Sequence, residues 1–363
     1  MKIKKHISQL LIIILLTSLI FTGCSSKDQN FTYSRDLNSK GYWRGVKALD
    51  YVTLADYSNL LIPKEKHTVT DEEIDREVKE ILESFSEKEE VTDAIEVRDG
   101  DTLKIAYVGK VDGVPFEGGA TGEEGAEVTI GVTNYIDGFL DQLIGHYPGE
   151  TFDINVTFPT DYHNEDLKGK DAVFTITIMH LLVSVYPELT DEFVMENFYE
   201  VNGWQTKDQV ISDIKEDLRA DKISGFIQTY LLENSEIKEL PHIISNYQDE
   251  YMLLIYSNYA SQYQMTLNDF LRNYMGIESK EELLEQNRQS NDQVANLHLI
   301  IQAIGEQEKI VPTDKDVDNY FKEYMDTDNY SDFKEVYGMN YLKLTTLVQK
   351  VLDHIESIAT FED

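Results

Sequence analysis

The sequence is short of cysteine and of basic side chains. Its single cysteine, Cys24, excludes a disulfide bond within the chain. The 32 Lys and Arg residues stand against 67 Asp and Glu residues, a formal net charge of -35. Binding to phosphate backbones needs clustered Lys and Arg, so we expect no nucleic acid among the partners. An acid excess of this kind is typical of a solubility device.

Motifs for metal, nucleotide and serine-nucleophile sites are also missing. His146, His163 and His180 lie within one segment, but neither H-x-x-x-H nor paired carboxylate spacing accompanies them. No G-x-S-x-G, Walker or dinucleotide-binding loop is present. We therefore expect no metal and no cofactor.

Long apolar runs are scarce, and the clearest one lies near the N-terminus. The basic stretch MKIKK precedes the apolar run Leu10–Phe21, which is shorter than the roughly 20 residues that span a bilayer. FTGCSS follows at once. We predict that residues 1–23 are a signal peptide that resembles a bacterial lipoprotein signal, in which cleavage exposes Cys24 for lipidation. The alternative is an ordinary buried or free cysteine.

A polar stretch and then an apolar arm follow this predicted signal. Residues 24–45 predict a flexible tether that would hold the folded part above the outer face of the cell membrane. Residues 46–97 predict an N-terminal arm and helix that pack with the helical part of the chain. Thr70 and Glu73 form the capping-box pattern that starts this helix.

From residue 98 to 185 the pattern becomes that of strands. Apolar and polar residues alternate in several short runs, and Asp112-Gly113 is a strong hairpin signal. A short helix is expected between Ile136 and Ile144. Phe116 lies in the glycine-rich bend VPFEGG, where it is either a core residue or an aromatic held open for binding. These features predict a compact α+β unit.

Residues 186–363 predict an all-helical region with short connections. Thr206 and Ser279 each open a capping-box pattern, and Pro241 interrupts the helical run. Tyrosine and methionine crowd the following segment. They predict either a client-holding surface, with Tyr251 and Tyr259 as contacts, or a helix buried between its neighbours.

The stretches GDTLKIAYVGKVDGVPFEGG, IDGFLDQLIGHYPGETFDINVTFP and PELTDEF occur in the order of a known family. The segment 98–185 resembles the FKBP-type peptidyl-prolyl isomerase domain, in the version found in the trigger factor family. Residues 186–363 resemble the helical client-binding domain of that family. The resemblance implies an FKBP-like antiparallel sheet wrapped on a short helix, plus an all-α domain.

One part of the family pattern has no counterpart. Nothing here resembles the basic ribosome-docking domain, and the predicted signal peptide occupies its place. The resemblance therefore implies a secreted relative with no ribosome as partner. Its clients would be unfolded or newly exported polypeptides with X-Pro bonds, outside the cytoplasm.

The resemblance also implies a set of pocket residues. Phe139 would form the floor, Phe116 and Phe174 the walls, and the Ile136 N–H would meet a client carbonyl. Two positions depart from the small FKBP proteins: Glu117 replaces the usual Asp, and Asn164 replaces a rim tyrosine. Taken alone, each aromatic here is typical of core packing. The implied catalytic set is Tyr107, Phe116, Glu117, Ile136, Phe139, Tyr162 and Phe174, with Tyr135 and Asn164 as client contacts.

The sequence thus predicts a lipid-anchored peptidyl-prolyl cis-trans isomerase and folding chaperone. The alternative is a non-catalytic holdase that uses the FKBP-like domain as a scaffold. A solute-binding lipoprotein would instead need two α/β lobes, which the long helical region argues against.

Overall fold

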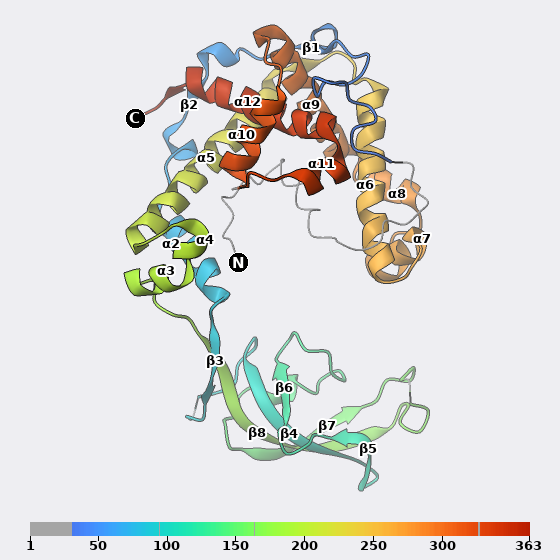
Figure 1. Cartoon of the computed structure of the whole chain (residues 1–363). Coiled ribbons are helices and arrows are strands. Elements are labelled where there is room, and N and C mark those ends of the chain that lie inside the picture. Colours follow the sequence, from blue (N-terminus) through green and yellow to red (C-terminus); the bar gives the residue numbers. More distant parts are fainter. Residues whose placement is uncertain (1–30, 94, 163, 326) are drawn as a thin grey trace. The chain divides into compact units, whose positions relative to one another are not determined.

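The computed structural model describes residues 31–93, 95–162, 164–325 and 327–363 (Figure 1). The chain divides into two compact units. We call Val78–Leu189 the sheet unit, and the described residues up to Glu77 together with Thr190–Asp363 the helical unit. The predicted signal peptide and Cys24 lie outside the described residues.

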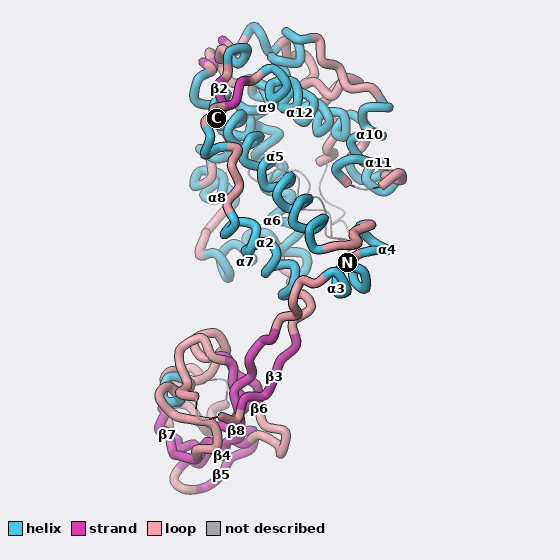
Figure 2. The backbone as a smooth tube through the Cα atoms, turned by 90° about the vertical axis from the view of Figure 1, so that its left-hand side faces the viewer, coloured by secondary structure: helices cyan, strands magenta, loops and turns pink. Residues whose placement is uncertain are grey.

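The sheet unit holds an antiparallel sheet, whose strands are magenta in Figure 2. Its central path runs β3-β8-β4-β5, while β6 pairs with β4 and β7 pairs with β8. The strands are β3 (Glu87–Val91), β4 (Thr102–Val111), β5 (Val114–Ala120), β6 (Ala126–Thr129), β7 (Thr151–Thr157) and β8 (Asp171–Val185).

The alternation along the strands decides which side chains enter the core. On β8, Ala172, Phe174 and Ile176 are buried, whereas Asp171 and Val173, at the alternate positions, are exposed. A strand sends successive side chains to opposite faces, so the sheet has one apolar face and one solvated face. The FKBP-like sheet expected from the sequence is confirmed.

A hairpin turn and a short helix were predicted within the sheet unit. Asp112 and Gly113 form a two-residue hairpin loop with φ of 52° and 79°, as the sequence predicted. The short helix expected from Ile136 to Ile144 is reduced to one 3-10 turn, Asp141–Leu143. Gly138, with φ of 75°, stops a regular helix from forming earlier, because a right-handed helix needs negative φ.

Helix α2 (Asp71–Glu83) begins with the predicted capping box. The Thr70 N–H donates to Glu73 Oε2 over 2.8 Å, and the Glu73 N–H donates to Thr70 Oγ1 over 3.3 Å. The charged residues after α2 form the exposed strand β3. β3 pairs with the end of β8, so its backbone hydrogen bonds come from that partner strand.

The helical unit is built from helices of very different lengths. The long ones are α5 (Lys207–Asn234), α6 (His242–Gln262), α9 (Arg288–Glu308) and α12 (Met339–Ile358). The shorter ones are α3 (Asp191–Asn197), α4 (Tyr199–Asn202), α7 (Leu267–Phe270), α8 (Lys280–Gln286), α10 (Asp314–Tyr324) and α11 (Ser331–Tyr337).

Several single turns and two-residue strands complete this unit. The turns are η2 (Ala48–Asp50), η3 (Tyr57–Asn59), η4 (Lys64–Lys66) and the π-turn η6 (Leu271–Met275). β1 (Val52–Thr53) pairs antiparallel with β9 (Glu236–Ile237), and β2 (Leu61–Ile62) pairs parallel with β10 (Thr360–Phe361). None of the helices among the described residues is long and apolar enough to cross a membrane.

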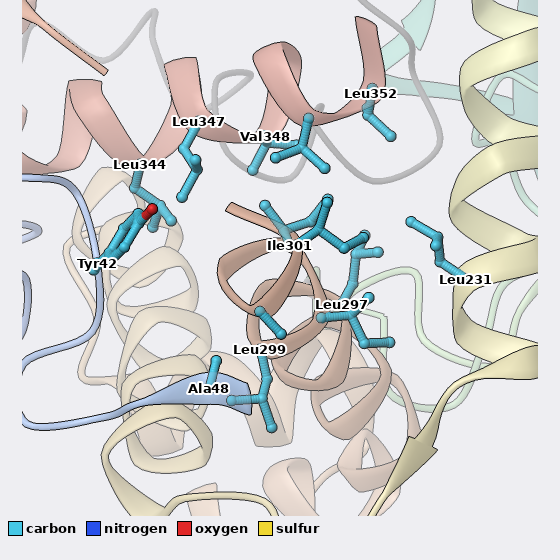
Figure 3. Packing of buried hydrophobic residues seen from close by; sticks show 14 of the residues in the cluster. Tyr42, Ala48, Leu231, Leu297, Leu299, Ile301, Leu344, Leu347, Val348 and Leu352 are labelled. Carbon is cyan, nitrogen blue, oxygen red and sulfur yellow. The ribbon is translucent and has the colours of Figure 1, made fainter. Parts of the chain in front are cut away.

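The core of the helical unit lies around α9. Leu297, Ile301 and Ile304 of this helix are at most 3% exposed. Figure 3 shows Leu347 and Val348 of α12 directed toward the side chains of α9. Burial of apolar area on this scale is the main favourable term in folding.

The predicted tether is wrong for residues 31–45. Leu37 and Trp43 have no exposed area, and they belong to the same core as α9. The Trp43 N–H donates to the buried amide of Gln302 over 2.7 Å. The Ser34 hydroxyl donates to the Tyr337 carbonyl over 2.8 Å. Aromatic residues within a polar stretch therefore make this segment part of the helical unit.

Candidate active site

Three aromatic side chains meet on the apolar face of the sheet. Phe174 comes from β8 and Tyr107 from β4, and Phe139 lies just before the 3-10 turn. The Phe139 and Phe174 ring centroids are 5.0 Å apart, and Tyr107 lies 5.4 Å and 5.7 Å from them. All three pairs are edge-to-face, the arrangement that aromatic quadrupoles favour. Phe139 and Phe174 are buried, so they form the inner part of this group.

A second layer of rings surrounds these three and reaches the surface. Phe116 of β5 lies 5.9 Å from Phe174 and 5.7 Å from Phe158. Tyr162 lies 4.8 Å from Phe158. Phe116 and Tyr162 are partly exposed, whereas Phe158 is buried. We call Tyr107, Phe116, Tyr135, Phe139, Phe158, Tyr162 and Phe174 the aromatic cluster.

Two glycines make room for these rings. A Cβ on Gly109 would lie 2.4 Å from Phe174, which is its direct partner across the β4–β8 pair. A Cβ on Gly119 would lie 2.6 Å from Phe116. Both distances are shorter than any real contact, so only glycine permits the observed ring positions.

Polar groups lie at the edge of the aromatic cluster. The Tyr107 backbone is fixed on both sides by Thr121, which donates its N–H to the Tyr107 carbonyl over 3.0 Å and whose hydroxyl accepts the Tyr107 N–H over 3.1 Å. The ring centroid of Tyr135 lies 4.8 Å from that of Phe139 and 6.2 Å from that of Tyr107. Burial first, and then the neighbouring Tyr107, raise the pKa of Tyr135 above its ordinary value.

Ile136 borders the aromatic cluster through its backbone. Its carbonyl accepts the Phe139 N–H over 2.9 Å. Within the described part of the chain, the Ile136 N–H has no acceptor. The geometry therefore leaves this N–H available to a ligand carbonyl, the role that the sequence resemblance implied.

Two predicted residues lie apart from the ring contacts. Glu117 is exposed on β5, next to the partly buried Phe116. Asn164 is also exposed, and its side-chain oxygen accepts the Asp166 N–H over 3.0 Å, which closes a local turn. The structure brings neither of them into the ring contacts, and their roles stay predictions.

A hollow of about 920 Å³ lies on the solvated face of the sheet. Two of its acids accept hydrogen bonds from neighbouring threonines: Thr175 donates to Asp153 over 2.6 Å, and Thr157 donates to Asp171 over 2.7 Å. Among the described residues, no three metal-ligating side chains gather as a metal ion would need. The hollow is lined by Lys110, Asp112, Gly113, Asp137, Asp153, Asn155, Val156, Thr157, Asp171, Ala172, Val173 and Thr175.

Comparison with known proteins agrees with this arrangement. Residues 93–179 match the FKBP-type peptidyl-prolyl cis-trans isomerase family, and residues 196–356 match the C-terminus of bacterial trigger factor. The trigger factor of Halothermothrix orenii is 34% identical over 326 residues, which cover 85% of this chain and 73% of that protein. The chain belongs to the trigger factor family.

Other trigger factors give similar values. That of Finegoldia magna is 32% identical over 85% of this chain and 71% of its own length. That of Alkaliphilus oremlandii is 32% identical, and the match covers 75% of this chain and 63% of that protein. A solved trigger factor chaperone, described under promiscuous substrate recognition in folding and assembly, aligns with 15% identity and a TM-score of 0.30. Family membership therefore rests on the sequence relatives.

The two client contacts predicted in the trigger factor-like helical unit, Tyr251 and Tyr259, differ in their exposure to solvent. Tyr251 is 3% exposed and packs against Tyr33, with ring centroids 6.0 Å apart, so its prediction as a client contact is wrong. It is a core residue because the segment from Phe31 covers α6. Tyr259 is 41% exposed, and its role as a client contact stays a prediction.

Sequence reasoning missed three members of the site. Phe158 joins Phe116 to Tyr162, and Gly109 and Gly119 make room for the rings. Phe158 ends the alternating run that forms β7, which was a usable signal for an inward position. No comparable signal marks Gly109, because its partner Phe174 becomes its neighbour only through strand pairing.

Proposed function

We propose that this trigger factor-like chain is a peptidyl-prolyl cis-trans isomerase and folding chaperone for exported proteins, at the outer face of the cytoplasmic membrane. The observation that carries the enzymatic part is the aromatic cluster, which has a buried floor and a partly exposed rim in an FKBP-type domain. Clients are unfolded or newly exported polypeptides with X-Pro bonds.

Isomerisation of an X-Pro bond needs no nucleophile and no metal. Rotation about the bond breaks amide resonance, and the uncatalysed barrier is about 18–20 kcal/mol. The twisted transition state has a pyramidal nitrogen and a less dipolar carbonyl than the planar amide. An apolar aromatic surface therefore binds the twisted state better than the planar one, and this difference is the source of catalysis.

The residues of the aromatic cluster and the neighbouring Ile136 would have different roles in this reaction. Phe139 and Phe174 form the apolar floor for the proline ring, and Phe116 is the wall beside it. The Ile136 N–H and the Tyr107 hydroxyl lie at the edge, where they would donate to the carbonyls of the client. Exclusion of water from the aromatic surface strengthens these few polar contacts.

Proline-limited refolding of a model protein tests the enzymatic claim. We expect the full mature chain to accelerate the slow phase at substoichiometric concentration. Phe116→Leu should weaken the acceleration, since it removes the partly exposed wall and keeps apolar volume. Val173→Ala, on the solvated face of β8 beside Phe174, is the matched control and should match the parent. A correctly folded parent chain that leaves the slow phase unchanged would refute the enzymatic claim.

The membrane part of the proposal rests on sequence. MKIKK, the apolar run and Cys24 form the pattern of a lipoprotein signal, and lipidation of Cys24 would anchor the chain. Phe31 packs against the core of the helical unit, so at most residues 25–30 would separate that unit from the anchor. Six extended residues span at most about 20 Å, which keeps the unit close to the bilayer. The net charge of -35 opposes binding to ribosomal RNA, and we propose no ribosome as partner.

Membrane fractionation tests this part. We expect the parent chain in the membrane fraction after labelling with a radioactive fatty acid, and the label to be lost in Cys24→Ser. Because Cys24 is the only cysteine, no other thiol can take the label by thioester or thioether chemistry. An unlabelled parent chain found in the soluble fraction would reject the anchor and leave the isomerase claim intact.

A second candidate function is that of a non-catalytic holdase. It is favoured by an exposed aromatic patch in the helical unit, formed by Tyr263 and Tyr274, which are 53% and 54% exposed. Their ring centroids are 4.9 Å apart, and the exposed Met275 follows on η6. Tyrosine and methionine are adaptable contact residues, which suits the binding of varied unfolded chains.

Aggregation assays separate the two functions. If the chain is only a holdase, suppression of client aggregation survives Phe116→Leu but falls in the double variant Tyr263→Ser/Tyr274→Ser, and refolding is never accelerated. If the chain is an isomerase and chaperone, Phe116→Leu weakens the acceleration of refolding and leaves suppression of aggregation in place. The refolding rate therefore decides between them.

A further inference from the structure

The pairing of β4 with β5 is irregular directly beside the aromatic cluster. Pro115 and Ala120 of β5 pair with the two β4 residues that flank Gly109, so this one residue faces residues 116–119 of β5. The extra residues form a bulge, which bends a strand and changes the direction of its side chains. Phe116, the wall of the proposed site, lies within this bulge.

Gly118 makes the turn of the bulge. Its φ of 78° lies in the left-handed region, which residues with a side chain rarely adopt. A Cβ added at Gly118 would meet no heavy atom within 4 Å, whereas a Cβ added at Gly119 would lie 2.6 Å from the Phe116 ring. The bulge therefore needs Gly118 for its backbone rotation and Gly119 for space.

This turn brings Phe116 back over its own strand. In a regular strand, residues three apart in sequence are separated by about 10 Å and point to opposite faces. Phe116 and Gly119 are three apart, yet the ring of one occupies the space beside the backbone of the other. The same ring packs edge-to-face against the buried Phe158 and Phe174, with centroids 5.7 Å and 5.9 Å away. A backbone support and two buried rings thus hold it in place.

We propose that Gly118 is a positioning residue whose left-handed backbone conformation directs the Phe116 ring toward the floor of the site, where it forms the wall for the proline ring of the client. This inference rests on the proposed isomerase function and deepens it, since it assigns Gly118 a role through Phe116. An L-residue disfavours the left-handed region by about tenfold relative to glycine, so a substituted bulge moves the ring out of the aromatic cluster. A wall that is fixed before the client arrives needs no ordering during binding.

Steady-state kinetics on an X-Pro tetrapeptide, with the full mature chain, tests this role through substitutions at one position. Gly118→Ala should lower kcat/KM about tenfold, and Gly118→Val should lower it further, because β-branched residues tolerate positive φ least. Gly118→Asn should lower it only about twofold, since asparagine adopts the left-handed region more readily. Asparagine is larger than alanine, so an effect of side-chain volume would reverse the order of these two variants.

Gly113→Ala is the matched control. Gly113 closes the β4–β5 hairpin with φ of 79°, and a Cβ added there would also meet no atom within 4 Å. It lies outside the aromatic cluster. Gly113→Ala should therefore lower the midpoint of thermal unfolding about as much as Gly118→Ala does, but it should leave kcat/KM unchanged.

The proton NMR shifts of the Phe116 ring report its position independently of activity, because the rings of Phe158 and Phe174 displace them. These shifts should move toward the values of an unfolded chain in Gly118→Ala and stay unchanged in Gly113→Ala. Gly118→Ala combined with Phe116→Leu should be about as active as the weaker of the two single variants, because Gly118 acts through Phe116.

Three results in an active parent chain overturn the inference: parent-like activity of Gly118→Ala, a greater loss in Gly118→Asn than in Gly118→Ala, or an equal loss in Gly113→Ala. If Gly118→Ala does not fold, parent-like ring shifts together with a tenfold loss in Gly118→Asn overturn it instead. An inactive parent chain overturns the proposed function. The ring shifts still decide the inference in that chain, since unchanged Phe116 shifts in Gly118→Ala overturn it and the expected movement supports it.

Discussion

At the scale of single residues, glycine rather than an aromatic sets the geometry of the candidate site. Gly109 lies opposite Phe174 in the β4–β8 pair, and the Phe174 ring occupies the space where a side chain would stand. Phe116 lies over Gly119 in the same way. The glycine-rich bend VPFEGG thus leaves space for the ring of its own Phe116. That ring is partly exposed and partly packed in the aromatic cluster.

The first prediction concerns Gly109→Ala. The new Cβ would lie 2.4 Å from Phe174, so the ring must move and the packing of the floor is lost. We expect a fall of about 1–3 kcal/mol in the free energy of unfolding, measured by urea titration, and a loss of isomerase activity. Gly122→Ala is the control, since no atom lies within 4 Å of its Cβ position. Equal stability of the two variants would contradict the packing argument.

At the scale of elements, the contact of α2 with α5 carries an unusual group of acids. Asp221 of α5 is partly buried, and its buried Oδ1 has no hydrogen-bond partner among the described residues. Burial first, and then the charges of Asp217 and Glu77, raise the pKa of Asp221 to about 7. Because the folded state keeps a proton that the unfolded state releases near pH 4, folding stability falls as the pH rises from about 4 to 7.

The second prediction follows from this sign. Asp221→Asn should be more stable than the parent chain at pH 8, by roughly 1 kcal/mol after allowing for solvent screening, and equally stable near pH 4. Thermal unfolding across that pH range measures the difference. Glu216→Gln, an exposed acid on the same helix, is the control and should leave the curve unchanged. A constant gain of Asp221→Asn at every pH would show that charge is not the cause.

The third prediction concerns the segment 31–45. Trp43→Ala removes a side chain with no exposed area, whose ring lies 5.0 Å from that of Tyr247. We expect a loss of about 3–5 kcal/mol in the free energy of unfolding of the helical unit, followed by circular dichroism at 222 nm. Lys40→Ala, exposed on the same segment, should change stability by less than about 0.5 kcal/mol. Equal changes in stability for Trp43→Ala and Lys40→Ala would contradict a role of this segment in the core and would favour the predicted tether.

The sheet and the segment 31–45 show which features could be predicted from the sequence and which could not. Strand alternation and the Asp112-Gly113 turn are local signals, and both predicted the observed sheet. The burial of residues 31–45 depends on α6 and α12, which are distant in sequence, so the local polarity of the segment was misleading. The floor and walls of the site were predicted through family resemblance, since the aromatic residues alone are typical of any core.

At the scale of the whole molecule, the chain joins two kinds of surface. The sheet unit carries the aromatic cluster, and the helical unit carries the exposed patch around Tyr263 and Tyr274. A client held by one surface stays at high local concentration for the other, which favours repeated encounters. We therefore predict that Tyr263→Ser/Tyr274→Ser slows the refolding of an unfolded protein client but leaves isomerisation of a short tetrapeptide unchanged. Equal losses on both substrates would contradict this division of roles.

The central claim is that the aromatic cluster binds the X-Pro bond and turns it. The most direct measurement is two-dimensional NMR exchange on a proline peptide with a catalytic amount of the full mature chain, together with the shifts that the peptide induces in the protein. We predict cross peaks between the cis and trans forms, and induced shifts at Tyr107, Phe116 and Ile136. Absence of exchange cross peaks, or induced shifts confined to the solvated face of the sheet around Asp153 and Val173, would contradict it.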